Sequence, residues 1–257
     1  MSRLQRGSGI LVLAAVIALW QLLAMLGVVT ENQLASPTRI VAATVEELQE
    51  GTLAREIMAT ARRIIIGFSF AVVFGVLSGF ALGRSKLLHA AFAPIIEFLR
   101  PMPVVAILPI AIFVLGLGDR MTYSVVAFAS GWIILLHAMD GIRSIDPVLI
   151  DTGRTFHIRP LRQFLTIALP ASAPHTFTGM RVGFGIAVIV TVVVELISGF
   201  GGGLGDYIGV SQGALRVPEA YSGIVLVAIL GYGLAQLFAL LERRLMAWHH
   251  GFKQQAR

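Results

Sequence analysis

Two ionisable side chains sit in the middle of an apolar, proline-rich stretch. Glu97 and Arg100 lie three residues apart, so on a helix they share one face and can form an ion pair. Charges inside a membrane are functional candidates by default, and Arg100 can offer positive potential to an anion. Pro94, Pro101, Pro103 and Pro109 are expected to interrupt this helix, and broken helices often line transport cavities. The structural alternative, which we favour, is a pair that holds the broken helix against its neighbours.

A second apolar stretch carries Arg181 near its start and Glu195 near its end. We interpret Arg181 as an anchor that extends its head group to the membrane interface, in preference to a ligand. Glu195 is interpreted as a helix-packing partner or gate element. Small side chains on the same stretch allow close helix approach, and we expect that face to meet a second copy of the chain; they are Gly179, Gly183, Gly185 and Ala187.

Catalytic and cofactor-binding patterns are missing from the sequence. Neither Lys86 nor Lys253 follows a glycine, so the chain has no P-loop and cannot cradle ATP phosphates in that way. There is no cysteine and no H-E-x-x-H. We therefore expect no catalytic residue, no metal site and no bound cofactor, and any ATP hydrolysis would belong to another subunit.

The composition indicates an integral membrane protein. Of 257 residues, 56% are hydrophobic and 13% are charged, and the mean hydropathy is +0.83. A water-facing surface needs more charge than this. The net charge of +6 does not indicate a nucleic-acid partner, because the basic residues are scattered and form no stripe.

The apolar runs predict an all-α membrane protein with about six transmembrane helices in a single domain, residues 1–257. If both termini lie on one side, that side holds roughly twice as many Lys and Arg residues as the other, which predicts cytoplasmic termini. The predicted spans, each of roughly 20 or more mainly apolar residues, are residues 10–29, 64–83, 90–116, 121–139, 176–198 and 220–241.

The connection 140–175 is longer than a helical bundle requires, and it lies on the predicted cytoplasmic side. Asp146 followed by Pro147 is a helix start, and a short helix can run from Val148 to Phe156. A break follows, and Pro160 can open a second helix through Ala168. We expect Pro170 and Pro174 to stop that helix before the fifth span. Two short helices joined at an angle form either a docking element or a loop that packs only on its own bundle.

At this connection the sequence resembles the inner-membrane permease subunit of binding-protein-dependent ABC importers, of the nitrate, sulfonate and taurine type. The cytoplasmic motif of that family is E-A-A-x3-G-x9-I-x-L-P. Asp151, Thr152 and Gly153 take the E-A-A places, and His157 takes the place of the glycine. The remaining motif positions are Ile167, Leu169 and Pro170, and Arg154 and Thr155 directly follow the E-A-A positions.

Flanking segments carry the resemblance over residues 30–250. Residues 97–103, E-F-L-R-P-M-P, resemble the subfamily's E-F-L-R-P-x-P, and residues 140–143, D-G-I-R, resemble its entry to the loop. Gly179, Met180 and Arg181 resemble its G-x-R, and residues 203–205 resemble its G-L-G. Each segment is short, whereas their common order and spacing are specific.

The resemblance implies a type I importer permease fold, called MetI-like, with cytoplasmic coupling helices in a bacterial inner membrane. It also implies a second copy of the permease, two cytoplasmic ABC ATPase subunits and a periplasmic or lipid-anchored binding protein. The short helix at the motif would insert into a groove on the ATPase, centred on Asp151, Thr152 and Gly153. The solute would be a small anion such as a sulfonate, taurine or nitrate. The alternative is a secondary transporter or channel driven by an ion gradient.

Overall fold

The computed structural model describes residues 3–27, 30 and 33–246, with side chains from residue 11 onward. The chain divides into two compact units. The first unit comprises residues 1–60 and 195–229, and the second unit comprises residues 61–194 and 230–257. Three helices contribute residues to both units: α3 (Thr52–Arg84), α9 (Leu169–Ser198) and α11 (Val217–Leu245). The single domain predicted from sequence stays a prediction.

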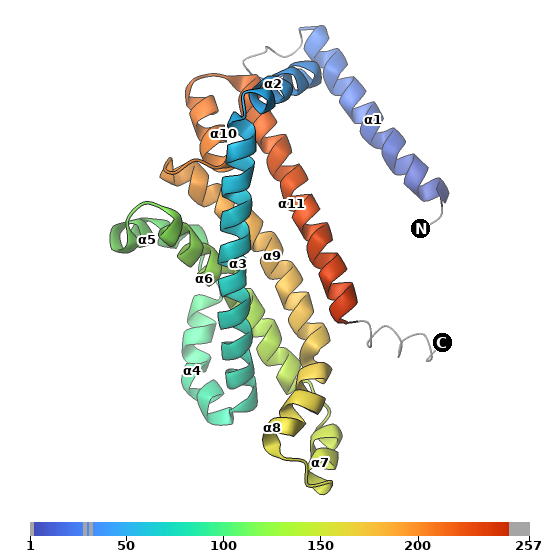
Figure 1. The fold of residues 1–257 in the computed structure, drawn as a ribbon, viewed down its shortest axis with the longest axis vertical. Helices are drawn as coiled ribbons and strands as arrows, with labels where there is room; N and C mark the ends of the chain where they lie inside the picture. Colours follow the sequence, from blue (N-terminus) through green and yellow to red (C-terminus); the bar gives the residue numbers. More distant parts are fainter. Residues whose placement is uncertain (1–2, 28–29, 31–32, 247–257) are drawn as a thin grey trace. The chain divides into compact units, whose positions relative to one another are not determined.

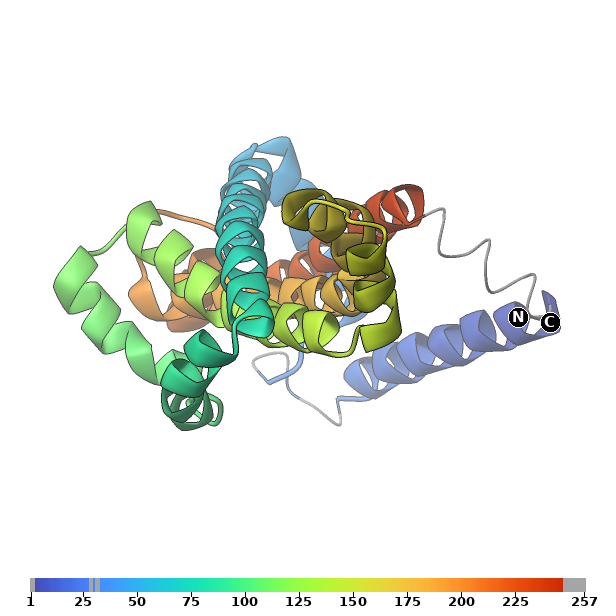
Figure 2. The same cartoon turned by 90° about the horizontal axis from the view of Figure 1, so that it is seen from below.

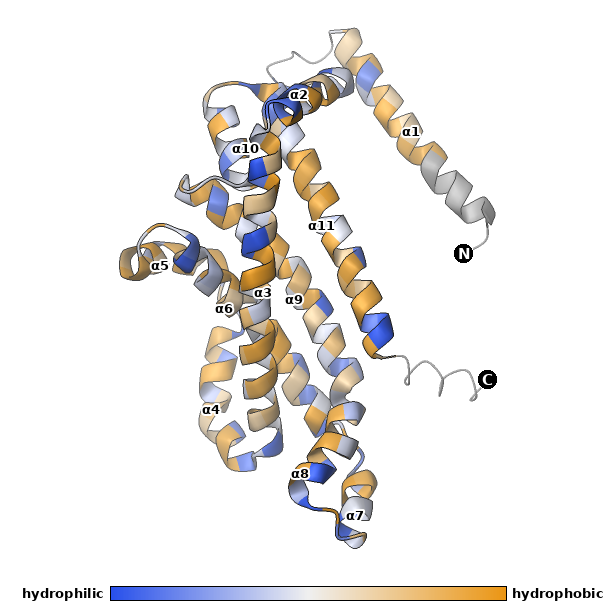
Figure 3. Cartoon of the chain, viewed as in Figure 1, coloured by the Kyte–Doolittle hydropathy of each residue, from blue (hydrophilic) through white to orange (hydrophobic). Residues whose placement is uncertain are grey.

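Helices account for every regular element in the described part of the chain (Figure 1). Four helical segments are long and apolar enough to cross a membrane, namely Thr52–Arg84, Asp119–Arg143, Pro160–Ser198 and Val217–Leu245. Figure 3 shows hydrophobic residues along these helices and hydrophilic residues at the turn between α7 (Pro147–Thr155) and α8 (Pro160–Gln163). The all-α membrane fold is therefore confirmed, and the second, fourth, fifth and sixth predicted spans lie within these four segments and stay predictions.

The predicted first and third spans differ from this pattern. The first corresponds to α1 (Arg3–Met25), whose described apolar part, Leu11–Met25, is shorter than a full span. The third is not one straight helix. It consists of α4 (Lys86–Leu99), then η1 (Val104–Ile107) and α5 (Leu108–Leu115), bent by 93° at the intervening prolines. Proline removes a backbone donor and clashes with the preceding turn, so Pro101 and Pro103 break the helix as predicted. The prediction was wrong for Pro94, which lies inside α4, and for Pro109, which lies in the first turn of α5, where proline is tolerated.

The second unit is built around α6 (Asp119–Arg143), which has the largest set of buried residues among its helices. Glycines along α3 let its backbone approach α6 closely. A Cβ at Gly75 would lie 2.7 Å from the Gly131 carbonyl oxygen and 2.9 Å from Ile134 Cβ, so no larger residue fits there. Close approach through small residues is the usual way in which membrane helices pack.

Small residues of α9 pack on the same helix. A Cβ at Gly183 would lie 3.0 Å from Ile134 Cγ1, and one at Gly179 would overlap His137. Gly185 alone of these glycines has open space around its Cα. The expectation that this whole face meets a second copy is therefore wrong for Gly179 and Gly183, because α6 already occupies it.

The first unit contains α2 (Pro37–Gln49) and α10 (Leu204–Gly213). Arg216, between α10 and α11, links α2 to the start of α11 through an Nη2–Oε1 contact of 2.6 Å with Glu47 and an Nε–Oε1 contact of 3.1 Å with Glu219. Burial, followed by the negative charge of Glu47, raises the pKa of Tyr207 to about 12. Tyr207 therefore stays protonated throughout the physiological range.

Candidate functional site

The chain between α6 and α9 forms an elbow, which we define as residues 144–168 and which holds α7, α8 and η2 (Phe164–Ala168). Figure 2 shows this end of the molecule from below. The start of α7 follows the predicted capping pattern. Asp146 is the N-cap, its Oδ1 accepts a hydrogen bond of 2.9 Å from the Val148 amide, and Pro147 occupies the first turn. A carboxylate at this position satisfies a free amide and favours the positive end of the helix dipole.

The end of α7 is a Schellman turn. The Ile158 amide donates to the Gly153 carbonyl at 3.0 Å, and the His157 amide donates to the Arg154 carbonyl at 2.9 Å. His157 lies in the left-handed region, with φ 54°. Glycine is the usual residue at this position, and it is the residue that the family motif has there. The histidine therefore keeps the turn, at a conformational cost of about 1 kcal/mol.

One face of α7 packs on the chain itself. Gly153 is buried, and a Cβ there would lie 2.8 Å from Gln163 Nε2 and 3.0 Å from Ile167 Cδ1. The Gln163 side-chain amide also donates to the Ile150 carbonyl. Ile167, a motif residue, thus contacts the helix that carries the rest of the motif. Within the elbow, α7 therefore packs on α8 and η2.

The other face of α7 is open to solvent. Asp151 and Thr152 are exposed, and Asp151 pairs with Arg154 at 3.1 Å across one helical turn. Large apolar side chains are exposed next to these polar groups, which is unusual outside an interaction surface. They are Val148 at 67%, Leu149 at 48%, Phe156 at 74% and Leu161 at 72% exposure.

The prolines beyond the elbow do not stop the helix, so that expectation is wrong. Helical structure runs from Pro160 to Ser198, with Pro170 and Pro174 inside α9. The π-helical segment η2 directly precedes Leu169 and Pro170, and the Leu169 amide bonds to the Phe164 carbonyl five residues back. A π-type turn shifts the carbonyl register, so a proline can follow without ending the helix.

The predicted pair of Glu97 and Arg100 forms, with 3.5 Å between Oε1 and Nη1. Both side chains are more than half exposed, at 68% and 54%. The pair lies at the last turn of α4, directly before the bend that contains Pro101 and Pro103. Within this chain it faces outward, where it is accessible to lipid, solvent or another subunit.

Arg181 of α9 binds Glu242 of α11 within the second unit. Its Nη2 lies 2.7 Å and 2.5 Å from the two carboxylate oxygens. Glu242 is mostly covered, with 14% exposure, whereas Arg181 is 65% exposed. The arginine thus links two long helices, a role that the sequence does not reveal because its partner is 61 residues away.

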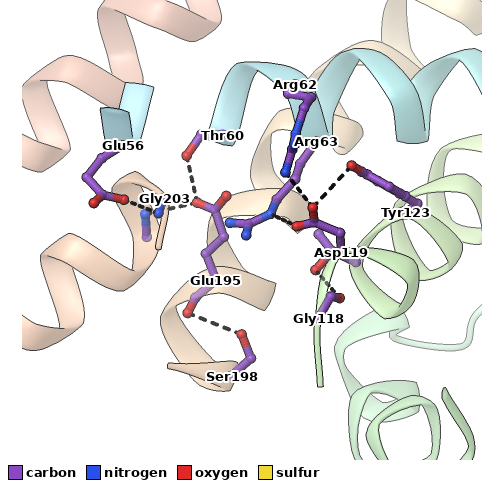
Figure 4. Close-up of polar contacts among 12 residues, drawn as sticks. Glu56, Thr60, Arg62, Arg63, Gly118, Asp119, Tyr123, Glu195, Ser198 and Gly203 are labelled. Carbon is purple, nitrogen blue, oxygen red and sulfur yellow. Dashed lines mark hydrogen bonds and ion pairs between the residues drawn. The ribbon is translucent and has the colours of Figure 1, made fainter. Parts of the chain in front are cut away.

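Glu195 is the central acceptor of a buried network in the first unit (Figure 4). Its Oε2 accepts from Thr60 Oγ1 at 2.8 Å and from the Gly205 amide at 3.0 Å. Thr60 Oγ1 also accepts from the Leu204 amide at 2.7 Å, and a Glu56 carboxylate oxygen accepts from the Gly203 amide. Three side chains thus satisfy the free amides that begin α10. The prediction of Glu195 as a helix-packing partner or gate element stays a prediction, whereas Glu56 and Thr60 were not expected from the sequence.

A second polar cluster that the sequence did not indicate lies in the second unit (Figure 4). Arg62 and Arg63 of α3 both bind the carboxylate of Asp119, the first residue of α6. The Arg63 Nε–Oδ1 distance is 2.8 Å, and the Arg63 side chain is 3% exposed. The cluster fixes α3 to the start of α6. Only a charge pair 56 residues apart could have signalled it, and such pairs cannot be selected from one sequence.

Sequence comparison places these features in a known family. Residues 71–246 match the model of a protein family described as "binding-protein-dependent transport system inner membrane component". The chain is 28% identical over 245 residues to the putative aliphatic sulfonates transport permease protein SsuC of Bacillus subtilis, covering 95% of this chain and 88% of the relative. It is 27% identical to the taurine transport system permease protein TauC of Escherichia coli, covering 92% and 88%. It is 30% identical to the nitrate import permease protein NrtB of Synechocystis, covering 73% and 68%.

Structural comparison finds the same fold. A chain of the MetNI methionine ABC transporter, solved in inward-facing conformations, superposes with a TM-score of 0.64 and 19% identity. The match covers 78% of this chain and 97% of that one. The fold is therefore that of MetI-like permeases, as the family resemblance implied. The chain belongs to the family of inner-membrane components of binding-protein-dependent transport systems, the multi-pass permeases of ABC importers.

Proposed function

We propose that two copies of this chain form the membrane pore of an ATP-driven importer, and that a separate ATPase drives it through the elbow. The solute would be a small anion of the sulfonate, taurine or nitrate class, delivered by a binding protein. The names of the similar permeases support this solute class. The chain supplies the pore and the coupling contact, and the partner ATPase supplies the hydrolysis.

The observation that carries the proposal is the two-sided character of α7. Its inner face is packed on Gln163 and Ile167, whereas its outer face exposes Val148 and Phe156. An exposed apolar surface next to Asp151 and Arg154 suits a groove on a protein partner, where the apolar side chains become buried.

The elbow can act as a rigid lever. A helix that is capped at both ends moves as one body, and η2 continues directly into α9. A displacement of α7 would therefore reach the long helix through Ile167, Leu169 and Pro170. The exposed motif positions Asp151, Thr152 and Thr155 would contact the ATPase, whereas Gly153 would transmit the motion inward. Gly153 is suited to this role because it lets η2 approach closely.

The proposed orientation places both termini and the elbow in the cytoplasm. It rests on the excess of Lys and Arg residues on that side. In this orientation Glu97, Arg100, Pro101 and Pro103 lie at the bend of the third span, where a broken helix can border the translocation path. The pair of Arg181 and Glu242 would secure the cytoplasmic end of α11, and Glu195 would hold the outer loop before α10.

Reconstitution tests the proposal and separates it from transport driven by an ion gradient. The chain is placed in liposomes with the ATPase and binding protein of the same transport system, and uptake of labelled taurine, an alkanesulfonate and nitrate is measured. The proposal predicts uptake of one of these anions that requires the ATPase, the binding protein and ATP together. Uptake by the chain alone under a sodium or proton gradient would contradict it.

A further inference from the structure

Two cavities meet where the C-terminal end of α3 lies beside the elbow, within the second unit. The first has a volume of about 450 Å³ and is lined mainly by apolar residues, with Arg84 among them. Its walls come from the last two turns of α3 and from α8 and η2. The residues that line it include Leu77, Phe80, Ala81, Arg84, Leu161 and Phe164.

The second cavity, of about 440 Å³, shares Arg84, Pro160 and Phe164 with the first, and its lining combines basic residues with apolar ones. Arg154, His157 and Arg159 complete its ring of cationic and titratable side chains. None of the described residues that line the two cavities is acidic. Asp151, which pairs with Arg154, belongs to neither lining.

The order of these walls follows the membrane boundary. The uncharged run 64–83 ends at Arg84, so the apolar cavity lies at the depth of the acyl chains. The basic cavity begins at Arg84, at the depth of the head groups. A site that combines an apolar slot with several arginines matches a phospholipid with an anionic head group, and basic pockets between membrane helices on the cytoplasmic side bind such head groups. A free phosphate would not need the apolar slot.

We propose that an anionic phospholipid of the cytoplasmic leaflet binds at this junction. Its phosphate would lie between Arg84 and Arg159, and one acyl chain would lie along Leu77, Phe80 and Phe164. His157, which stands where the family motif has glycine, adds an imidazole to the head-group cavity. The inference rests on the proposed function only for the side of the membrane that the elbow faces.

A bound lipid would join α3 to the elbow that we propose as the coupling element. The head group would contact residues from both sides of the junction, Arg84 from α3 and Arg159 from the segment before α8. The anionic lipid content of the membrane would thereby influence how firmly the elbow is held.

Native mass spectrometry of the purified chain tests the site without the ATPase or transport, so its outcome is independent of the proposed function. Phosphatidylglycerol and phosphatidylcholine with identical acyl chains are titrated into the wild type, the double variant Arg84→Gln/Arg159→Gln and the control Arg162→Gln. Arg162 is exposed and lines neither cavity. We expect the double variant to lose most phosphatidylglycerol binding, the control to retain it, and phosphatidylcholine to bind weakly to all three.

A second variant, Ala81→Phe, fills the apolar cavity while keeping every arginine. We expect it to weaken phosphatidylglycerol binding, and we expect soluble glycerol phosphate at the same concentration to leave the bound lipid in place. Equal phosphatidylglycerol binding by the wild type and the double variant would overturn the proposal. Displacement of the lipid by glycerol phosphate, or full binding by Ala81→Phe, would also overturn it and would indicate a site for a free anion.

Discussion

Two short helices of this chain, α7 in the second unit and α10 in the first, end in the same way and begin in different ways. Both end in a Schellman turn whose left-handed residue is not glycine, namely His157 with φ 54° and Leu215 with φ 58°. The start of α7 is capped by the preceding residue, Asp146. The start of α10 is capped by side chains from other helices, Glu56, Thr60 and Glu195.

The difference separates local from tertiary information. Because its cap is local, the start of α7 does not depend on side chains from other helices. For α10 the cap exists only when α3 and α9 supply their side chains, so the start of this helix depends on the packing of the first unit. The local cap of α7 suits the lever role that we propose for the elbow. The tertiary cap of α10 suits the fixed outer loop of the same proposal.

The largest effect in this comparison should come from Gly203→Ala. Gly203 has φ 109°, and a Cβ there would overlap the Glu195 carboxylate. We expect a loss of about 3 kcal/mol in the free energy of unfolding, from backbone strain and from displacement of a buried hydrogen-bonded carboxylate. Thermal unfolding in detergent measures it. The matched control is Gly213→Ala on α10, where no atom lies within 4 Å of the added Cβ; equal stability of the two variants would refute the tertiary cap.

Thr60→Val should have the next largest effect. It removes the hydroxyl that accepts from the Leu204 amide and donates to Glu195, and it leaves both buried groups without that partner. We expect a loss of about 2 kcal/mol, measured in the same way. Thr178→Val is the control, because that exposed hydroxyl bonds only to the Pro174 carbonyl of its own helix. A loss no larger than that of the control would mean that the network contributes little.

Asp146→Ala should have a smaller and local effect. Loss of the cap on the Val148 amide should cost about 1 kcal/mol. Hydrogen exchange should become faster at the first amides of α7, while exchange in α6 and α9 stays unchanged. Asp151→Ala is the control, since its exposed pair with Arg154 contributes about 0.5 kcal/mol or less. Faster exchange throughout the second unit would show that α7 is not locally encoded.

The smallest effects should come from His157→Gly and Leu215→Gly. Each substitution removes the steric strain of a side chain in the left-handed backbone region, which stabilises the folded state. The greater conformational freedom of glycine in the unfolded chain offsets part of this stabilisation. We expect each variant to be more stable by roughly 0.5 kcal/mol. Unfolding midpoints of both variants should rise together. A fall for either one would show that its side chain contributes more than its conformation costs.

The same distinction explains which features were predictable. The start of α7 at Asp146 and Pro147 and its end before Arg159 follow from neighbouring residues, and the structure confirms both. The Glu195 network and the Arg181 pair were not predictable, because each depends on residues brought near by folding. The prediction that the helix stops at Pro170 and Pro174 was wrong, because helical structure continues through both residues. A π-helical turn absorbs that proline, and no residue pattern in a single sequence signals such a turn.

In the proposed function, α7 transmits the motion of an ATPase to this permease through Gly153. The most direct measurement compares ATP-driven uptake by liposomes that contain the wild type, Gly153→Glu or the control Gly213→Glu, together with ATPase and binding protein. A glutamate at position 153 must displace Gln163 and Ile167, whereas position 213 is open. We predict that Gly153→Glu inserts into the membrane, and that ATP is hydrolysed without uptake, while the control transports normally. Normal uptake by Gly153→Glu would contradict the account.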